Sequence, residues 1–308
     1  MVYLTVITRE VSPAIKECEL THINREPIDY HKVVQQHDAY VSVFEKLIKE
    51  GYDVELIRLP ALAAYPDSMF MEDVAMFYDG CAVIPRAGAE SRRGEADQAR
   101  RWVEFLRPGH TYALEKPAHT DGGDVFPVGK YIFVGQSTRT NDEAFAQLKK
   151  ITDNYAYVDE NGKGHRYECV RLPVKGRLHT KTAGSFLTDS VVLMDTNACP
   201  AEAFTSRGIE VLSAPASEEG ASNPLSFTVQ FPDGSHFKRV VVINAGYPKT
   251  SELVRNFASR ETQAGRPTEV VELEMDEIAK AEGSLTCLSL LCYHKKSGNI
   301  SKGTSQSR

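Results

Sequence analysis

Several familiar sequence patterns are missing from this 308-residue chain, and each absence removes a class of protein. The six cysteines include no CxxC pair and do not cluster with histidines at zinc-site spacing, so no metal site is predicted. Dense runs of Lys and Arg are absent and the formal net charge is −6, which argues against nucleic acid or an anionic membrane surface as the main partner. A small molecule is therefore the expected partner.

Long apolar runs are lacking as well. The opening stretch MVYLTVIT meets charge at Arg9 and Glu10, so it is too short for a signal-peptide core or a membrane span. We interpret it as a first core strand and expect a cytoplasmic protein whose scattered cysteines stay reduced. Taken alone, each cysteine, Cys287 in SLTCLSL included, reads as a small buried hydrophobic residue.

What the chain does contain is a repeated order of elements. With 42% hydrophobic and 25% charged residues it has the composition of a globular protein with a large core. The repeated unit is a pair of apolar strands, then a helix whose apolar residues fall at helical spacing, then one more apolar strand. This order occurs five times. The predicted helices are 31–50, 95–106, a segment after Asn141, 199–205, and a segment from Ser251. Hairpin turns are predicted at Asp79-Gly80, Gly129-Lys130 and Pro232-Asp233-Gly234.

Such hairpin-helix-strand units cannot each bury a core alone, so they must pack side by side. The apolar segment GSLTCLSLLCYH is expected to pair with the first strand and close a ring. The sequence thus predicts an α/β fold, a five-bladed propeller of pseudo-five-fold units around a central cavity, in one domain over 1–293. An open α/β sandwich is the alternative from periodicity alone. The polar segment 294–308 lacks apolar periodicity and is expected to be disordered.

Polar residues gather where the predicted hairpins begin. The stretch PDSMFMEDVAMF holds Asp67, Glu72 and Asp73 at the head of an apolar strand, where buried charge is costly without a partner. A solvated loop would explain them, but paired carboxylates also match the planar donors of a guanidinium. HTDGGDVF and GRLHTKTAG add Asp121, Asp124 and His179 at two further hairpin starts.

A thiol, an imidazole and a carboxylate in one cavity would supply a nucleophile, a proton shuttle and a group that orients the shuttle. Spacing alone leaves open whether Cys287, His179 and Asp121 meet. Arg92, Arg93 and Arg139 are candidates for holding a substrate carboxylate, or are ordinary surface arginines.

Taken together, PDSMFMED, AGAESRRGE, DGGDVFPVGKYIFVGQSTRTN, LHTKTA, NAGYP and EGSLTCLSL resemble the dimethylarginine dimethylaminohydrolase family of the guanidino-modifying (pentein) superfamily. The resemblance runs to about Tyr293 and implies the five-fold propeller. It also implies that Cys287 of the terminal LTC motif is the nucleophile, His179 of the LHxK motif the acid and base, and Asp121 the residue that orients the imidazole. Asp124 would serve the turn.

The same resemblance implies the substrate contacts. Asp67, Phe70, Glu72 and Asp73 would hold the guanidinium and its surroundings, Arg92 and Arg139 the α-carboxylate, and Leu20 a loop that closes over the site. Three departures concern the substrate. Glu282 stands where the family has aspartate near the amino-group site, Thr182 where it often has serine, and 217–239 keeps only Ser222 and Asn223 of the family pattern.

The resemblance thus implies hydrolysis of Nω-methylated L-arginine to L-citrulline and a methylamine through a thiouronium intermediate on Cys287, without metal or cofactor. An arginine deiminase is an alternative, although such enzymes resemble longer chains with an added helical region. Another Nω-substituted arginine is a second alternative, and a non-catalytic binding protein of the same fold is a remote third. The partner is then a small cationic amino acid; oligomeric state is left open.

Overall fold

The computed structural model describes residues 2–159 and 161–295. Within these ranges the chain forms an α/β fold with five three-stranded sheets and one two-stranded sheet. All five larger sheets share one plan, in which a central strand pairs antiparallel with one neighbour and parallel with the other. In each sheet a helical segment connects the central strand to its parallel partner. The repeated order predicted from the sequence is therefore present.

The first and last strands of the described chain share a sheet. β1 (Val2–Arg9) is its central strand, α1 (Tyr30–Lys49) leads to the parallel strand β2 (Val54–Leu59), and β17 (Ser289–Lys295) pairs antiparallel with β1. A short helix η1 (Ile15–Glu17) follows β1. The expected pairing of the C-terminal strand with the first strand is confirmed.

The other four units follow in chain order. The second contains η2 (Met71–Val74), β3 (Met76–Tyr78), β4 (Cys81–Ile84), α2 (Glu95–Leu106) and β5 (Thr111–Ala113). The third contains η3 (Gly122–Asp124), β6 (Val125–Val128), β7 (Tyr131–Gln136), α3 (Asp142–Thr152), the hairpin β8 (Ala156–Val158) and β9 (Gly164–Arg166), and β10 (Glu168–Pro173). The fourth contains α4 (Thr180–Ala183), β11 (Gly184–Thr188), β12 (Val191–Met194), α5 (Glu202–Thr205) and β13 (Glu210–Ser213). The fifth contains β14 (Leu225–Gln230), β15 (Phe237–Asn244), α6 (Pro248–Gln263) and β16 (Thr268–Leu273), and then α7 (Asp276–Ala279) and η4 (Leu285–Leu288) lead to β17.

Local sequence explains the boundaries of these elements. The side chain of Asp29 accepts hydrogen bonds from the backbone N–H groups of His31 and Lys32 and caps α1, and Asn141 caps α3 in the same way. Gly80 has φ +87° in the turn between β3 and β4, a conformation that glycine adopts without strain. The predicted hairpins and long helices therefore rest on capping and turn residues as well as on apolar spacing.

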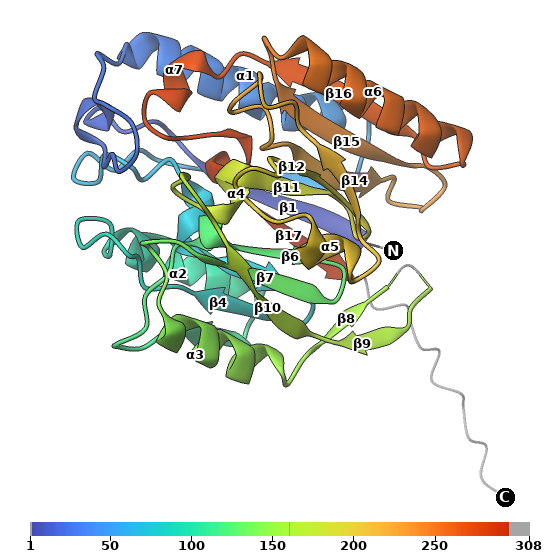
Figure 1. The fold of residues 1–308 in the computed structure, drawn as a ribbon, viewed down its shortest axis with the longest axis horizontal. Coiled ribbons are helices and arrows are strands. Elements are labelled where there is room, and N and C mark those ends of the chain that lie inside the picture. The colour runs from blue at the N-terminus through green and yellow to red at the C-terminus, as the bar shows by residue number, and fades with distance from the viewer. Residues whose placement is uncertain (1, 160, 296–308) are drawn as a thin grey trace, which may run out of the picture.

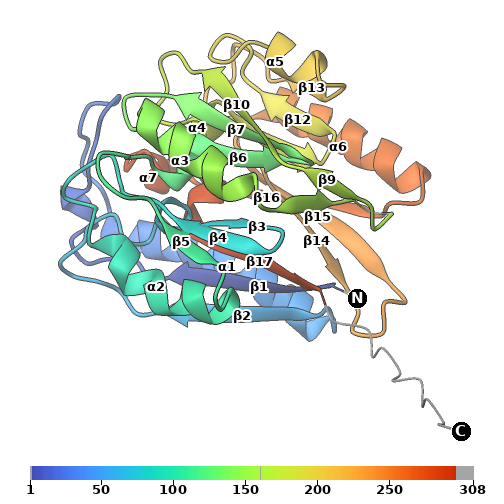
Figure 2. The same ribbon diagram turned by 90° about the horizontal axis from the view of Figure 1, so that it is seen from below.

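The core is divided into five apolar clusters, each shared by two neighbouring units. One cluster joins α1 and β1 to the fifth sheet through Phe44 and Phe227, whose ring centroids lie 5.1 Å apart. Another joins the third and fourth units through Phe133 and Phe204, at 4.4 Å. The remaining three clusters bridge the first and second, second and third, and fourth and fifth units. In both ribbon views the longer helices α1, α2, α3 and α6 lie outside the strands (Figure 1, Figure 2).

Some predicted boundaries were wrong. Helix α6 begins at Pro248 rather than at Ser251, because proline is favoured in the first turn of a helix, and 199–205 is helical only over Glu202–Thr205. Cys287 lies in the turn η4 rather than in a strand. The domain boundary at 293 stays a prediction: β17 includes residues 294 and 295, and the rest of the predicted tail, 296–308, lies outside the described residues.

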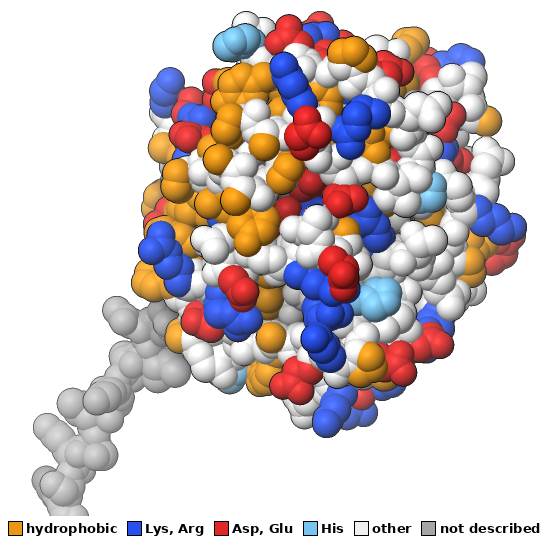
Figure 3. Space-filling model, turned by 90° about the vertical axis from the view of Figure 1, so that its left-hand side faces the viewer, with side chains coloured by type: hydrophobic (Ala, Val, Ile, Leu, Met, Phe, Trp, Pro, Cys, Tyr) orange, Lys and Arg blue, Asp and Glu red, His pale blue; other side chains and the backbone are white. Residues whose placement is uncertain are grey.

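Among the helices of the described residues, none is both long and apolar enough to cross a membrane. The face on the left-hand side of Figure 1 shows Lys and Arg side chains interspersed with Asp and Glu, beside a group of hydrophobic side chains (Figure 3).

Candidate active site

Short helical turns placed just before the antiparallel edge strand of a sheet bring the polar residues together. η2 precedes β3, η3 precedes β6, α4 precedes β11 and η4 precedes β17. These turns carry Glu72 and Asp73, Asp124, and Cys287, while Asp121 and His179 stand at the N-cap positions of η3 and α4. Because the four turns occupy equivalent places in four units, side chains far apart in sequence share one site.

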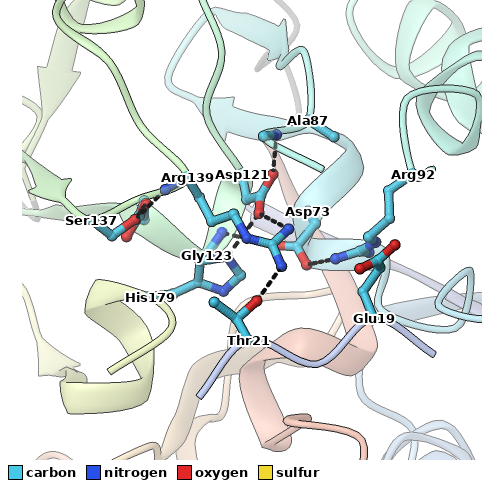
Figure 4. Close-up of polar contacts among 12 residues, drawn as sticks. Glu19, Thr21, Asp73, Ala87, Arg92, Asp121, Gly123, Ser137, Arg139 and His179 are labelled. Carbon is cyan, nitrogen blue, oxygen red and sulfur yellow. Dashed lines mark hydrogen bonds and ion pairs between the residues drawn. The ribbon is translucent and has the colours of Figure 1, made fainter. Parts of the chain in front are cut away.

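A buried histidine–aspartate pair lies at the centre of this site. The imidazole Nε2–H of His179 donates a hydrogen bond to Asp121 Oδ2 at 2.9 Å, and the two residues are 3% and 0% exposed. Asp121 also accepts a hydrogen bond from the backbone N–H of Gly88 at 2.8 Å and faces Arg139 Nη1 at 3.5 Å. Figure 4 shows Asp121 with its partners His179 and Arg139.

The charges around the pair set its protonation. Burial opposes ionisation of Asp121, but the hydrogen bond from His179, the positive charges of His179 and Arg92, and the Gly88 N–H hold its pKa well below the ordinary value. Burial likewise opposes protonation of His179, yet the charge of Asp73, together with Asp121 and Asp124, raises the histidine pKa to about 9. His179 is therefore an imidazolium at neutral pH.

Cys287 lies in a region of negative potential. The thiol belongs to a residue that is 9% exposed, and its backbone N–H donates to the Ser284 carbonyl at 3.1 Å. Burial, followed by the charges of Glu72 and Asp73, raises the pKa of the thiol well above its ordinary value. The free site thus holds a neutral thiol. The charge of Asp73 helps to raise the pKa of both Cys287 and His179.

The carboxylate of Glu72 connects the turn α4 to the turn that carries Cys287. It accepts hydrogen bonds from Lys181 Nζ at 2.6 Å and from Thr286 Oγ1 at 2.8 Å. Asn223 donates to Thr286 Oγ1 and to the Lys181 carbonyl, and accepts from the Thr286 N–H. Burial raises the pKa of Glu72, and the Lys181 ammonium opposes that rise. Glu72 thereby links Thr286, which precedes Cys287, to Lys181, which follows His179 by two residues.

Asp73 and Arg92 form a second buried pair. Arg92 Nη1 donates to Asp73 Oδ2 at 2.7 Å, and Arg92 Nη2 donates to Glu95 Oε2 at 2.9 Å. The other oxygen of Asp73 accepts the backbone N–H of Gly123 at 2.9 Å. A Cβ atom on Gly123 would lie 2.6 Å from His179 Nδ1, so the imidazole packs directly on this glycine.

The remaining predicted residues surround the cluster. Asp67 accepts the backbone N–H of Glu19 at 3.0 Å, and burial raises its pKa. Phe70 is buried, and a Cβ on Gly283 would lie 2.3 Å from its ring. Leu20 is partly buried against the first apolar cluster, next to Thr21, whose Oγ1 accepts a hydrogen bond from Arg139 Nη2 at 2.7 Å.

A cavity of about 310 Å³ lies beside the cluster. Its lining includes Thr182, Asn223 and Ser284, together with His22 and Ile23 of the loop before α1 and with Glu282. Among residues 2–159 and 161–295, no three His, Cys, Asp or Glu side chains are grouped as a metal site. The arrangement offers a thiol, a protonated imidazole and several carboxylates beside a space suited to a small ligand.

Comparison with known proteins places the chain in a family. Dimethylarginine dimethylaminohydrolase of Streptomyces coelicolor is 31% identical over 284 residues, which cover 92% of this chain and 95% of the relative. The chain belongs to the dimethylarginine dimethylaminohydrolase family. The enzyme of the same name from Pseudomonas aeruginosa is 30% identical over 262 residues, 85% of this chain and 89% of the relative. No family model matches the chain.

Solved structures of similar proteins share the fold. A cysteine-to-serine variant of the Pseudomonas aeruginosa enzyme in complex with citrulline superposes with a TM-score of 0.76 at 26% identity, over 94% of this chain and 100% of that chain. The N-terminal domain of ArgZ, a cyanobacterial arginine dihydrolase, reaches a TM-score of 0.68 over 94% of this chain and 98% of that chain. At 16% identity this similarity indicates a shared fold and no more.

The structure brings most of the predicted family residues together, but with unexpected partners. Arg92 is already engaged by two carboxylates, and Arg93 pairs with the exposed Glu90 outside the cluster. Asp124 accepts from Ser137, Thr140 and the Thr180 N–H, which agrees with a role in the turn. The carboxylate of Glu282 accepts only backbone N–H groups of the loop before α1 among the hydrogen bonds of the described residues.

Sequence reasoning missed several residues of this family site. Lys181, Thr286, Thr21 and Gly123 contact the predicted residues directly, and none was singled out. Lys181 and Thr286 lie inside motifs that carry the resemblance, which was the available signal. Thr21 gave no signal, because its contact with Arg139 joins distant parts of the chain.

Proposed function

We propose that this protein hydrolyses Nω-methylated L-arginine to L-citrulline and methylamine or dimethylamine through a covalent intermediate on Cys287. The observation that carries the proposal is the buried hydrogen-bonded pair of His179 and Asp121 in a chain of this family, whose terminal motif also supplies a buried cysteine. An imidazolium can protonate a departing amine, and a thiol can become the nucleophile that expels it.

The five units are proposed to form a single domain over 1–293, arranged as a five-bladed α/β propeller around the site. Two observations support this arrangement. Each of the five apolar clusters bridges two consecutive units, and the one between α1 and the fifth sheet joins the last unit to the first. A second cavity of about 480 Å³ is lined by residues of all five larger sheets. All six cysteines carry free thiols, which supports a cytoplasmic location.

The two ends of the substrate would bind to side chains of opposite charge, the guanidinium to carboxylates and the α-carboxylate to arginines. Glu72 and Asp73 would hold the guanidinium in plane, with Asp67 and Phe70 beside it. Arg92 and Arg139 would receive the α-carboxylate, Leu20 would cover the ligand, and Thr182 would line the neighbouring space. Because Glu72 is paired with Lys181 and Asp73 with Arg92, a guanidinium has to share carboxylates that already have cationic partners.

The chemical steps follow from the protonation states. A bound guanidinium adds positive charge beside Cys287, which lowers the thiol pKa and lets the thiol lose its proton to solvent water, since His179 is already protonated. The thiolate attacks the central guanidinium carbon, a carbon–sulfur bond forms, and the carbon–nitrogen bond to the methylated nitrogen breaks as His179 gives that nitrogen its proton. The now neutral His179 takes a proton from water, whose oxygen attacks the same carbon and expels the thiolate. The released product carries a ureido group.

In this proposal Nδ1 is the nitrogen that exchanges protons, because Nε2 is bonded to Asp121. Asp121 keeps the ring in one orientation and stabilises its charged form. Glu72 and Asp73 contribute by orientation, which is worth several orders of magnitude in rate when a reacting carbon is held against its nucleophile.

The test measures citrulline release from asymmetric dimethylarginine, monomethylarginine and arginine. The parent protein should turn over a methylated arginine, and Cys287→Ser should reduce kcat by at least about 1000-fold. Cys199→Ser, which changes a buried cysteine outside the cluster, is the control and should remain active. Mass spectrometry of acid-quenched reactions should show an adduct on the peptide that contains Cys287. Full activity of Cys287→Ser, or an adduct on another cysteine, would refute the assignment, and faster turnover of arginine would favour a deiminase.

A further inference from the structure

The loop between η1 and α1 has few means of staying in place. Residues 18–29 form no helix or strand, and 21–27 are exposed. Only Cys18, Leu20 and Ile28 pack against the apolar core in this segment. Hydrogen bonds from the rest of the protein must therefore hold the middle of this loop (the site loop, 19–26).

A single carboxylate, that of Glu282, supplies three of them. Glu282 Oε2 accepts the backbone N–H of Thr21 at 2.8 Å, and Glu282 Oε1 accepts those of His22 at 2.6 Å and Ile23 at 3.0 Å. Three successive N–H groups converging on an anion form a nest, an arrangement that favours a negative charge over a neutral acceptor.

The backbone at Glu282 shows that this position is specialised. It has φ +55°, and among the described residues no other non-glycine residue has a positive φ. Side chains rarely adopt this conformation because it crowds the Cβ atom, and it persists where the surrounding structure imposes it. Here it lies between α7 and η4, just before the turn that carries Cys287.

The held loop reaches the catalytic pair through one arginine. Thr21 Oγ1 accepts from Arg139 Nη2 at 2.7 Å, and Arg139 Nη1 faces Asp121 Oδ2 at 3.5 Å. Figure 4 shows the guanidinium of Arg139 between Thr21 and Asp121. The same loop also forms one wall of the 310 Å³ cavity, through His22 and Ile23, beside Glu282 itself.

We propose that Glu282 is a positioning residue that latches the site loop, so that Thr21 fixes Arg139 where it receives the carboxylate of the substrate. This role rests on the proposed function for its substrate, but the latch itself does not. It differs from a direct contact between Glu282 and the substrate amino group, which the family resemblance implied. The three N–H donors of the loop already use three of the roughly four acceptor sites of the carboxylate, so holding the loop is its main contact in this structure.

The first experiment tests the latch without activity. Arg25 is the trypsin site within the site loop, and Glu282→Gly removes the carboxylate while relieving the positive φ. Trypsin should cut after Arg25 at least about tenfold faster in Glu282→Gly than in the parent, because a charge-assisted set of hydrogen bonds is lost. Glu219→Gln is the matched control, since Glu219 lines the same cavity but bonds Arg177, and it should behave as the parent. Equal cleavage of Glu282→Gly and parent would overturn the proposal.

The second experiment separates positioning from direct contact. For dimethylarginine, Glu282→Gly should raise KM about tenfold or more and change kcat by less than about threefold. The defect should vanish for the analogue that lacks the α-carboxylate and remain for the analogue that lacks the α-amino group. The reverse pattern would show that Glu282 contacts the amino group and would overturn the positioning role.

A second variant guards against a general structural defect. Thr21→Val keeps the backbone N–H groups that Glu282 accepts but removes the hydroxyl that Arg139 uses. It should reproduce the KM increase without accelerating trypsin cleavage; an unchanged KM would overturn the link from loop to arginine. If the parent protein hydrolyses no methylated arginine, the proposed function fails, while the cleavage rates still decide whether Glu282 holds the loop.

Discussion

The contact between Gly123 and His179 gives the sharpest prediction about the proposed chemistry. Gly123 follows Asp121 by two residues, and a Cβ atom there would stand 2.6 Å from Nδ1 and 2.9 Å from Cγ of the imidazole. Ordinary contact begins near 3.4 Å, so in Gly123→Ala the ring has to retreat by roughly 0.8 Å. Gly123 lies outside the left-handed region, so alanine suits its backbone, and the perturbation falls on the ring rather than on the chain.

A displacement of about 1 Å at a reacting group costs on the order of 100-fold in rate, and we expect a loss of this size in kcat for Gly123→Ala. KM should change less than kcat, because the new Cβ would stand 3.2 Å from Asp73 Oδ1, a much smaller overlap than the one with the imidazole. The assay is steady-state citrulline release with a thermal melt on the same sample. Gly164→Ala is the control, since its Cβ would meet only Ala156 at 3.8 Å. A kcat within about twofold of the parent, in a protein of unchanged Tm, would refute the role of the imidazole position.

Two further predictions concern charge. Asp121→Asn should lower the pKa of His179, measured by NMR titration, from about 9 toward 6.5, because the hydrogen bond and charge of Asp121 help to raise that pKa. The control is Asp159→Asn, at an aspartate that bonds His165, which should leave the pKa of His179 unaltered. The pKa of His179 is higher in the folded protein than in the unfolded chain, so protonation of His179 stabilises the fold fully below pH 6.5, and this stabilisation is lost as pH rises through 9. The difference in unfolding free energy between the parent and Asp121→Asn should therefore shrink as pH rises from 6.5 through 9. Lys181→Met should raise the pKa of Glu72 further and move the acidic limb of kcat/KM to higher pH, because Lys181 is its cationic partner; Lys249→Met, away from the cluster, should not. A histidine pKa still near 9, or an unmoved acidic limb, would contradict the respective prediction.

Local patterns made much of the fold predictable. Asp29 and Asn141 mark helix starts by capping, and Gly80 marks a hairpin by its backbone freedom, so these elements follow from short stretches of sequence. The turn around Cys287 was misplaced because LTCL is one apolar stretch with the strand that follows, and periodicity cannot separate a single helical turn from a strand.

The sequence predicted which residues of the site would matter, but not which side chains they contact. Glu72 and Lys181 are 109 positions apart, and their pairing depends on how the second and fourth units meet. Likewise, nothing near Glu282 in sequence indicates that its carboxylate holds backbone 259 to 261 positions away. Charge pairing of this kind is a property of the packed chain, because it requires the distances that only tertiary structure provides.

The pairing of β17 with β1 has a consequence for how the protein is made. Thr8 Oγ1 donates to the Leu288 carbonyl at 3.0 Å across 280 positions, so the turn that carries Cys287 is anchored on the earliest strand by the latest one. During synthesis the units that carry His179 and Asp121 leave the ribosome well before Cys287. A nascent chain therefore holds the imidazole and its carboxylate without the thiol, and acquires the proposed nucleophile only when β17 docks on β1. Contacts of such long range are also slow to form, so the pairing of β17 with β1 is expected to be a late step in folding.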